Sequence, residues 1–267
     1  MSVVLTETIG HVRVIRLNRP DRKNALTSEL GWSLVTALQE AASDDSVRCV
    51  AVTGNGDAFC SGLDLADGGG EPVATGLSQQ AEASDHLGWL GRFLLTMRWD
   101  CDKPVIIGLN GVAVGAGASL ALAGDIRIAA DTARLHPGYL RAGTSPDGGM
   151  TWTLPEMVGH QEAMRFLLDN RMVGADELLE RGFVVEVVPA ADLDARLAEY
   201  CEHIATTLPP LAVRRAKHQI VRSPMVLDIA ARLEEEIMKA RAGLDTADSR
   251  EAVQAIMEKR TPNFQGR

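Results

Sequence analysis

Two apolar strands that each run into a loop of small residues constrain this chain most. Residues 49–52 (Cys-Val-Ala-Val) precede a turn and then the run Ala-Phe-Cys-Ser-Gly-Leu-Asp-Leu at 58–65. Residues 105–109 precede a second such run, Asn-Gly-Val-Ala-Val-Gly-Ala-Gly at 110–117. Small residues allow another group to approach the backbone closely, because no long side chain shields the amides. Two loops of this kind predict a site in which backbone N–H groups hold an oxyanion between them.

The first part of the chain predicts a hairpin followed by a helix. Valine and isoleucine recur in residues 3–8 and 11–17, with Gly10 at the turn between them. Thr27 is a good helix N-cap. The apolar residues after it recur at helical spacing: Leu30, Leu34, Leu38 and Ala41.

Strands and helices then alternate, which predicts an α/β fold with crossover connections. Further apolar strands are expected at 47–52, 104–109 and 125–130, with a short helix that starts at Ala116 before the last of them. From about residue 191 the chain is expected to be almost wholly helical, with a break at the two prolines of Leu-Pro-Pro.

The stretch between the two loops is expected to hold a mobile loop and a helix. Residues 66–80 contain three consecutive glycines and a proline, which predict the loop. The helix is expected at about 80–99 and carries Trp89, Phe93 and Met97 at helical spacing. This stripe faces either the core, which is the commoner meaning of such a pattern, or a bound ligand.

Composition excludes several classes of partner. The chain has 267 residues, 46% apolar content and a formal net charge of −9, which disfavours nucleic acid and anionic membranes as partners. It has no run of about 18 apolar residues, so no membrane span is expected. The four cysteines form no CxxC pair, which predicts reduced thiols in a cytoplasmic protein rather than disulfides or a zinc site.

Four further motifs accompany the two loops. They are Arg-Pro-Asp-Arg-Lys-Asn-Ala-Leu at 19–26, Asp-Lys-Pro-Val at 102–105, Leu-Ala-Gly-Asp-Ile-Arg-Ile-Ala at 122–129, and Glu-Lys-Arg-Thr-Pro-Asn-Phe-Gln-Gly at 258–266. In this order, over nearly the whole chain, the motifs resemble the enoyl-CoA hydratase/isomerase (crotonase) superfamily. The resemblance implies a spiral of ββα units with a helical C-terminal part.

The same resemblance divides the chain into two regions. Residues 1–204 are expected to form the spiral core domain, and residues 205–267 a helical C-terminal region that packs on neighbouring subunits. A homotrimer or a dimer of trimers is therefore implied. The alternative is a helical cap on the same subunit.

An oxyanion hole is the central feature that the resemblance implies. Its two donors are the amide of Leu63 and the amide of Ala116, and the second also opens a helix whose N-terminal dipole favours an anion. Together they hold the carbonyl oxygen of an acyl-CoA thioester while the α-proton is removed. The alternative for residues 115–117 is a tight helix–strand contact that needs small residues.

The two glutamates that hold and activate water in family hydratases are missing. The matching positions are Ser119 and Tyr139. Serine is a poor base near pH 7, and tyrosine, with a reference pKa of about 10, stays protonated. The departure counts against simple hydration, and Tyr139 is expected either to donate a hydrogen bond to the acyl group or to be a core residue.

Asp147 is the remaining carboxylate in this neighbourhood. It lies in Gly-Thr-Ser-Pro-Asp-Gly-Gly at 143–149, where several isomerase branches of the family, including one like the phenylacetyl-CoA-pathway isomerases, use an acid. A single acid can move a proton from C2 to C4 of an enoyl thioester without water. For this role its pKa has to be raised by an apolar environment. The alternative is that Asp147 caps a helix at 148–157.

Substrate binding is expected to involve the N-terminal element and the first loop. Arg22 and Lys23 match an element that lies near the coenzyme A phosphates in the family, and two adjacent cations suit that task; the alternative is an ordinary charged turn. The full set of expected binding residues is Arg22, Lys23, Ala25, Ala58, Ser61, Gly62, Asp64, Leu65, Ser119 and Tyr139.

The sequence therefore predicts an enzyme that isomerises a double bond of an enoyl-CoA. Hydratase, decarboxylase or thioesterase chemistry in the same fold is the alternative, and a non-catalytic acyl-CoA-binding protein is the alternative from another class. No metal or redox cofactor is expected, since coenzyme A enters as part of the substrate.

Overall fold

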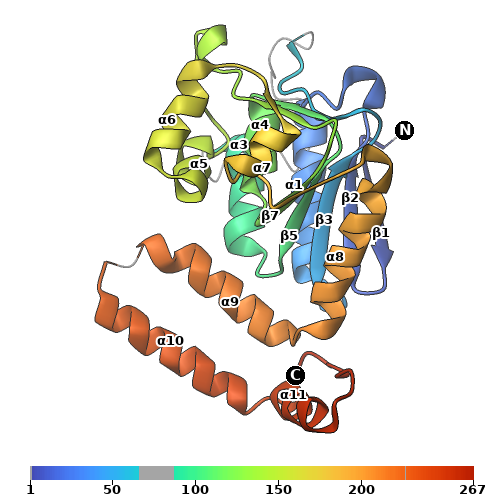
Figure 1. The fold of residues 1–267 in the computed structure, drawn as a ribbon, viewed down its shortest axis with the longest axis vertical. Coiled ribbons are helices and arrows are strands. Elements are labelled where there is room, and N and C mark those ends of the chain that lie inside the picture. The colour runs from blue at the N-terminus through green and yellow to red at the C-terminus, as the bar shows by residue number, and fades with distance from the viewer. Residues whose placement is uncertain (1, 66–86, 226) are drawn as a thin grey trace.

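A six-stranded sheet forms the centre of the structure (Figure 1). The computed structural model describes residues 2–65, 87–225 and 227–267. The strand order is β1-β2-β3-β5-β7-β10, and all neighbours are parallel except the hairpin of β1 with β2. The bounds are β1 Val4–Ile9, β2 Val12–Leu17, β3 Cys49–Gly54, β5 Val105–Leu109, β7 Ile126–Ala130 and β10 Glu186–Val188. The predicted hairpin and the strands predicted at 47–52, 104–109 and 125–130 are confirmed.

A second sheet of four short strands gives the fold its repeat. Its order is β4-β6-β8-β9, with bounds Ala58–Cys60, Val112–Val114, Arg134–His136 and Val173–Gly174. Three times, the chain passes from a strand of the large sheet to a strand of the small sheet and then to a helix. The three helices are α3 Gly88–Leu95, α4 Ala116–Ala123 and α5 Met150–Val158. This is the predicted spiral of ββα units.

At the centre of the large sheet, in β3, β5 and β7, both faces are buried, as is usual for parallel strands. On one face, Val50 and Val52 of β3 join a core with α1 (Ser28–Ser43), α3 and α4. On the other face, Cys49 and Ala51 of the same strand pack against α8 (Leu193–Thr207). Side chains of a strand point alternately to its two sides, so a single apolar run supplies both cores.

The predicted helix start at Thr27 is confirmed. The Thr27 side chain accepts a hydrogen bond from Leu30 N, at 3.2 Å, and so satisfies one of the free amides of the first turn of α1. Leu30, Leu34 and Leu38 are all buried. Local capping and helical spacing are therefore sufficient to place this helix.

The stripe of Trp89, Phe93 and Met97 belongs to the core. Trp89, Phe93 and Met97 are all buried in the cluster under the large sheet, with Met97 in a π-helical turn at Thr96–Asp100. The first part of the helix predicted at 80–99 and the loop predicted at 66–80 lie outside the described residues.

The C-terminal helices extend away from the sheets (Figure 1). The predicted break is present, because α8 ends at Thr207 and α9 begins at Pro210. The domain boundary predicted at 204/205 falls inside α8 and stays a prediction. The remaining helices are α6 His160–Asp169, α7 Ala175–Glu180, α9 Pro210–Arg222, α10 Ile229–Leu244 and α11 Ala247–Glu258. Within the described ranges, no helix is long and apolar enough to cross a membrane.

Lys217 fastens α9 to the rest of the molecule. Its ammonium group is buried, donates to the carbonyl oxygens of Met97 (2.6 Å) and Lys103 (2.7 Å), and pairs with Asp125 at 2.8 Å. A buried ammonium group that lost these partners would be strongly destabilising. The bonds therefore fix where the C-terminal helices leave the core.

Candidate active site

The first loop is held to the N-terminal element by a short parallel bridge between Leu26 and Leu63. Leu26 N–H donates to Gly62 O at 2.7 Å, and Asp64 N–H donates to Leu26 O at 2.9 Å. In such a bridge the groups on either side of Leu63 point to the partner, so those of Leu63 itself point away from it. Among the described residues, Leu63 N–H has no acceptor.

The second loop ends where α4 begins, at Ala116. Gly115 precedes the helix with φ +54°, a left-handed value that favours glycine. The first N–H groups of a helix have no acceptor within it. The Ala116 amide accordingly donates to no group in the part of the chain that the structure describes.

Two glycines bring these loops into contact. A methyl group on Gly62, which has φ +95°, would lie 2.7 Å from Val114 O and 3.9 Å from Ala116 N. A methyl group on Gly117 would lie 2.2 Å from Cys60 O. Since no side chain fits at either point, the backbone segments pack directly on one another. The structure thus brings together the two amides predicted to form the oxyanion hole.

Two asparagines that the sequence analysis did not single out hold the first loop in place. Asn24 is fully buried at φ +53°, and its Nδ2 donates to Ala58 O at 2.8 Å. Asn110 Nδ2 donates to the same oxygen at 3.1 Å, while its Oδ1 accepts from Gly54 N. The only sequence signal is that asparagine tolerates left-handed backbone and bonds to nearby main chain.

Several predicted substrate-binding residues lie where the first loop meets the N-terminal element. Ser61 N–H donates to Lys23 O at 3.0 Å, so Arg22 and Lys23 lie beside the first loop, and both are exposed. Leu65 is 83% exposed, whereas Ala25 and Ala58 are buried.

An ion pair adds a second connection at this junction. Arg19 pairs with Asp64 at 2.9 Å, with both side chains largely buried, and donates to Ala25 O at 2.5 Å. The Asp64 carboxylate thereby helps to hold the loop against the N-terminal element. Arg19 is a further residue at this junction that the sequence analysis placed in a motif without giving it a role.

Ser119, Tyr139 and Asp147 form one hydrogen-bonded cluster. Tyr139 Oη lies 2.6 Å from Asp147 Oδ1 and 2.7 Å from Ser119 Oγ. Ser119 Oγ also donates to Asp147 O at 2.9 Å. Ser119 and Tyr139 are buried and Asp147 is half-buried. Of the two positions without the expected glutamates, Tyr139 therefore contacts the remaining carboxylate directly, and Ser119 contacts Tyr139 and the main chain of Asp147.

Burial governs the ionisation of this cluster. It raises the pKa of Asp147 above the usual aspartate value, and the hydrogen bond from Tyr139 offsets part of that rise. Burial, followed by the hydrogen bond to Asp147, also raises the pKa of Tyr139, so the phenol stays protonated.

The alternative prediction that Asp147 caps a helix is wrong. Helix α5 begins at Met150, its N-cap is Gly149 at φ +82°, and no side chain caps it. A methyl group on Gly149 would lie 2.0 Å from Leu94 Cδ2, so packing against α3 sets this turn. The carboxylate of Asp147 points instead to Tyr139.

Cys60, next to the first loop, is a packing residue. Its thiol is fully buried, and burial raises its pKa to about 12. A thiol that stays protonated is a poor nucleophile.

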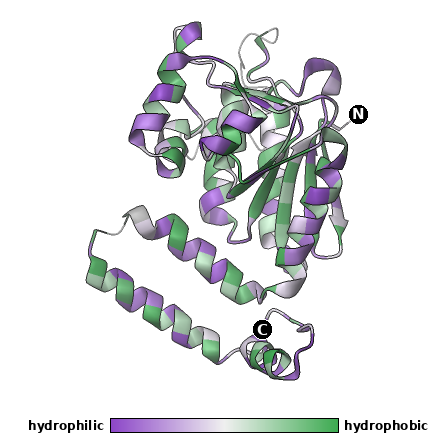
Figure 2. Cartoon of the chain, viewed as in Figure 1, coloured by the Kyte–Doolittle hydropathy of each residue, from purple (hydrophilic) through white to green (hydrophobic). Residues whose placement is uncertain are grey.

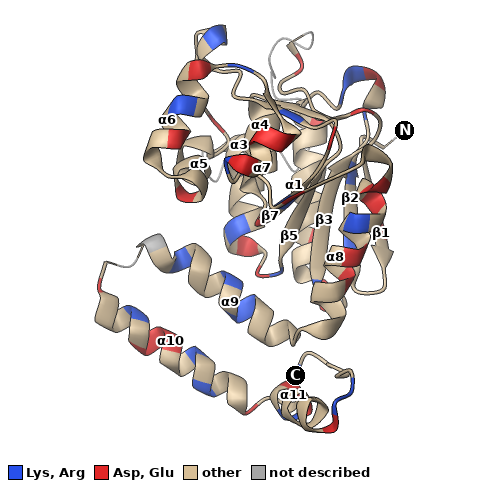
Figure 3. Ribbon diagram, in the orientation of Figure 1, with Lys and Arg blue, Asp and Glu red and all other residues tan. Residues whose placement is uncertain are grey.

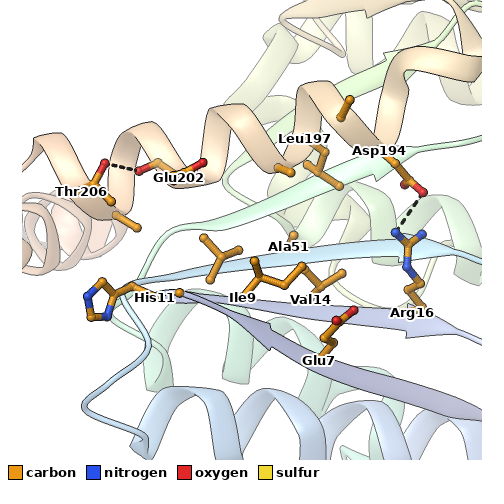
Figure 4. A pocket seen from close by; sticks show the side chains of 15 residues that line it. Glu7, Ile9, His11, Val14, Arg16, Ala51, Asp194, Leu197, Glu202 and Thr206 are labelled. Atoms are coloured by element: carbon orange, nitrogen blue, oxygen red, sulfur yellow. Dashed lines mark hydrogen bonds and ion pairs between the residues drawn. The ribbon is translucent and has the colours of Figure 1, made fainter.

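A separate groove lies on the other side of the large sheet (Figure 4). It has a volume of about 430 Å³ and lies between α8 and strands β1 and β2. Ile9, Val14 and Leu197 line it, and Arg16 pairs with Asp194 across it at 3.0 Å. None of the predicted site residues lines this groove. The candidate active site is therefore the junction of the two loops with the Ser119–Tyr139–Asp147 cluster.

Comparison with known proteins identifies the family. A family model described as enoyl-CoA hydratase/isomerase matches residues 7–267. The chain belongs to the enoyl-CoA hydratase/isomerase family. It is 38% identical to a probable enoyl-CoA hydratase of Rhodobacter capsulatus over 260 residues, which cover 95% of this chain and 94% of that protein. It is 34% identical over 267 residues to the 1,2-epoxyphenylacetyl-CoA isomerase of Escherichia coli, with both chains fully covered.

A solved structure of the family confirms the crotonase fold. The crystal structure of a probable enoyl-CoA hydratase/isomerase from Mycobacterium abscessus matches with a TM-score of 0.87 and 29% identity, and the match covers 100% of each chain. The protein is thus an enoyl-CoA hydratase/isomerase family enzyme that acts on acyl-CoA.

We expect Gly62→Ala to reduce turnover of an enoyl-CoA far more than it reduces stability. The new methyl group would lie 2.7 Å from Val114 O, so the segment that carries Leu63 N–H has to move away from Ala116. Loss of one oxyanion donor typically lowers kcat by about 10²–10³. Steady-state kinetics and thermal unfolding measure the two effects.

Gly182→Ala is the matched control. Gly182 also has positive φ, at +77°, but has open space around it. Both variants carry the cost of left-handed backbone, about 1–2 kcal/mol. Equal kinetic losses in the two variants would show that backbone strain alone, and not the contact of the loops, explains the effect.

Proposed function

We propose that this protein isomerises the double bond of an enoyl-CoA thioester with Asp147 as the single proton carrier. The observation that carries the proposal is the place of Asp147. Ser119, which binds the main chain of Asp147, follows Ala116 by three residues of α4, about 4.5 Å along the helix axis. A thioester held by the Ala116 amide therefore has a half-buried carboxylate near its acyl carbons.

The reaction is a transfer of one proton between two carbons. The Asp147 carboxylate removes a proton from C2 of a 3-enoyl thioester, and the electrons of that C–H bond form a dienolate. The N–H groups of Leu63 and Ala116 stabilise the negative oxygen. The protonated Asp147 then gives its proton to C4, the double bond forms between C2 and C3, and the thioester carbonyl is restored. No water is consumed.

The cluster supports isomerisation over hydration. Water addition needs groups that hold and deprotonate water, and the two positions expected to do so carry the hydroxyls of Ser119 and Tyr139. The raised pKa of Tyr139 keeps it protonated. Similar proteins are named both as hydratases and as an isomerase, so hydratase, decarboxylase and thioesterase activity and simple acyl-CoA binding are alternative outcomes of the assay.

We propose that Arg22 and Lys23 bind the phosphates of coenzyme A. Both are exposed beside the loop that carries Leu63, and phosphate groups are bound well by paired cations. In a chain with a net charge of −9, such an anion requires a local basic site of this kind. The exposed Leu65 and the backbone of residues 61–64 continue the same surface toward the oxyanion hole.

We expect Asp147→Asn to abolish isomerisation while leaving acyl-CoA binding intact. Asparagine retains an acceptor for Tyr139 but cannot carry the proton, and general acid–base catalysis is typically worth about 10²–10⁴ in rate. A 3-enoyl-CoA is incubated with either protein in deuterated water, and the products are followed by mass spectrometry. The wild type should yield the 2-enoyl isomer without the mass of water. Unchanged turnover in the variant would refute the role of Asp147, and an added water mass would indicate hydration.

The pH profile gives an independent check on the base. Asp147 removes a proton only when it is ionised, so kcat/KM should rise with pH through its pKa and level off above it. Because burial raises that pKa, the midpoint should lie above the ordinary value of about 3.9. Activity that increases as the pH falls through this range would contradict a carboxylate base.

We propose that the C-terminal helices assemble with copies of this chain, as a trimer or a dimer of trimers. Helix α10 buries none of its side chains, and Leu233, Ile237 and Leu244 on it are at least half exposed. Apolar and polar residues alternate along α10 in Figure 2, and charges of both signs mark the helix in Figure 3. An unpartnered apolar stripe on a helix is typical of an interface.

Light scattering after gel filtration tests this assembly. The wild type should have three or six times the chain mass of 28.6 kDa, and the double variant Leu233→Asp, Ile237→Asp should dissociate because the interface would bury two charges. Glu234→Lys, a charge change on the same helix, serves as the control. A wild-type monomer would contradict the proposal.

A further inference from the structure

The cluster around Asp147 has more short contacts than hydroxyl hydrogens. Three oxygen–oxygen contacts connect it: Ser119 Oγ to Tyr139 Oη at 2.7 Å, Tyr139 Oη to Asp147 Oδ1 at 2.6 Å, and Ser119 Oγ to Asp147 O at 2.9 Å. Each contact needs one hydrogen to be a hydrogen bond. The two hydroxyl groups supply one hydrogen each.

An ionised Asp147 therefore leaves one contact without a hydrogen. The carboxylate and the main-chain oxygen only accept, so both hydrogens come from Ser119 and Tyr139. If Tyr139 donates to Oδ1 and Ser119 donates to Asp147 O, two lone-pair oxygens face each other at 2.7 Å. If Tyr139 donates to Ser119 instead, or Ser119 donates to Tyr139, a different contact lacks its hydrogen, but one contact still lacks it. In a buried setting such a contact is costly.

A protonated Asp147 completes the set. Its Oδ1–H donates to Tyr139 Oη, Tyr139 donates to Ser119 Oγ, and Ser119 donates to Asp147 O. Each of the three contacts then contains one hydrogen, and the chain of bonds closes into a ring through the aspartate itself.

We propose that Ser119 is a positioning residue that makes Asp147 a stronger base, because its two contacts leave the ionised cluster one hydrogen short. Tyr139 acts in the opposite direction, since it is the donor that stabilises the carboxylate. The catalytic meaning rests on the proposed isomerase function, but the effect on the acid does not. Ser119 thus cannot act as a base itself but increases the basicity of Asp147.

Within residues 2–65, 87–225 and 227–267, few other groups affect this acid. Among the described residues, Tyr139 is the titratable side chain whose contact shifts the pKa of Asp147. Helix α3 packs against the adjoining Gly148 and Gly149 with the apolar Phe93 and Leu94, and α4 contributes the uncharged Ser119. No charged side chain in the described part of the chain contributes to the pKa shift of Asp147, so changes in the two hydroxyls should be visible in its titration.

Removal of each hydroxyl should shift the titration of Asp147 in opposite directions. Ser119→Ala frees the hydrogen of Tyr139 for the carboxylate, so the midpoint should fall. Tyr139→Phe removes that donor, so the midpoint should rise. Each shift should be about one pH unit, which corresponds to the net contribution of one hydrogen bond.

The infrared band of the protonated carboxyl group measures the midpoint in the full-length protein without substrate. The Asp147 signal is the part of the pH-dependent spectrum that Asp147→Asn removes. Ser28→Ala, at a buried serine on α1, and Tyr200→Phe, at the other tyrosine of the chain, are matched controls that should leave the midpoint unchanged. If the alanine variant does not fold, Ser119→Cys, with its weak donor, should give the same downward shift.

The result is decisive in either direction. Opposite shifts for the two variants support the proposal. An unchanged or raised midpoint on loss of the serine hydroxyl, or shifts of the same sign in both, would overturn it. The acid limb of the kcat/KM profile should move with the infrared midpoint, whereas a purely structural role would lower kcat without moving that limb. Failure of the isomerase assay would leave the infrared result standing, so the two proposals fail separately.

Discussion

The direct contact between two backbone segments, 60–63 and 114–117, is the constraint on which the rest of the site depends. It exists because Gly62 and Gly117 have no side chain where Val114 O and Cys60 O approach. The pairing of β4 with β6 brings the segments side by side, and Asn24 and Asn110 hold the turn before them by binding one carbonyl oxygen, that of Ala58. The donors of the candidate oxyanion hole, Leu63 just after β4 and Ala116 at the start of α4, are therefore placed by backbone packing and do not depend on side-chain rotamers.

A framework of this kind leaves the choice of reaction to a few side chains. The amides of Leu63 and Ala116 can stabilise a negative oxygen whatever happens at the neighbouring carbons. In the proposed reaction, the chemistry is then decided by the group three residues further along α4 and by the residues that face it. In this chain those groups are two hydroxyls and one carboxylate, connected in a single cluster. The proton inventory of that cluster limits what it can do: one acid can carry one proton.

Local patterns in the sequence were sufficient for individual strands, helices and the two small-residue loops, whereas the ββα spiral and the roles of the site residues came from the family resemblance. The Thr27 side chain caps α1 by binding the amide of Leu30, three residues along, and the leucines of α1 repeat at helical spacing. Both signals therefore lie within a short stretch of sequence. The cap predicted for Asp147 failed because long-range contacts decide that turn: Leu94 sets Gly149, and Tyr139 takes the carboxylate. Asn24 was missed for the same reason, since its side-chain amide donates to Asn55 O and Ala58 O, which lie 31 and 34 positions further along the chain. The sequence predicts features that residues close together in the chain determine. It does not predict features that depend on contacts between distant residues.

The position of Asp147 also shows how the fold and the proposed chemistry oppose each other. Burial raises its pKa, so the folded state binds the proton more tightly than the unfolded chain does. By linkage, the stabilisation from the protonated acid is fully present below the unfolded pKa and is lost as the pH rises through the folded pKa. At neutral pH the ionised carboxylate is therefore the less favourable state for the fold, and it is the state that a base needs. The same burial that destabilises the ionised carboxylate makes it a stronger base toward a carbon acid. A change that removed the cost of the buried charge would therefore also reduce its basicity.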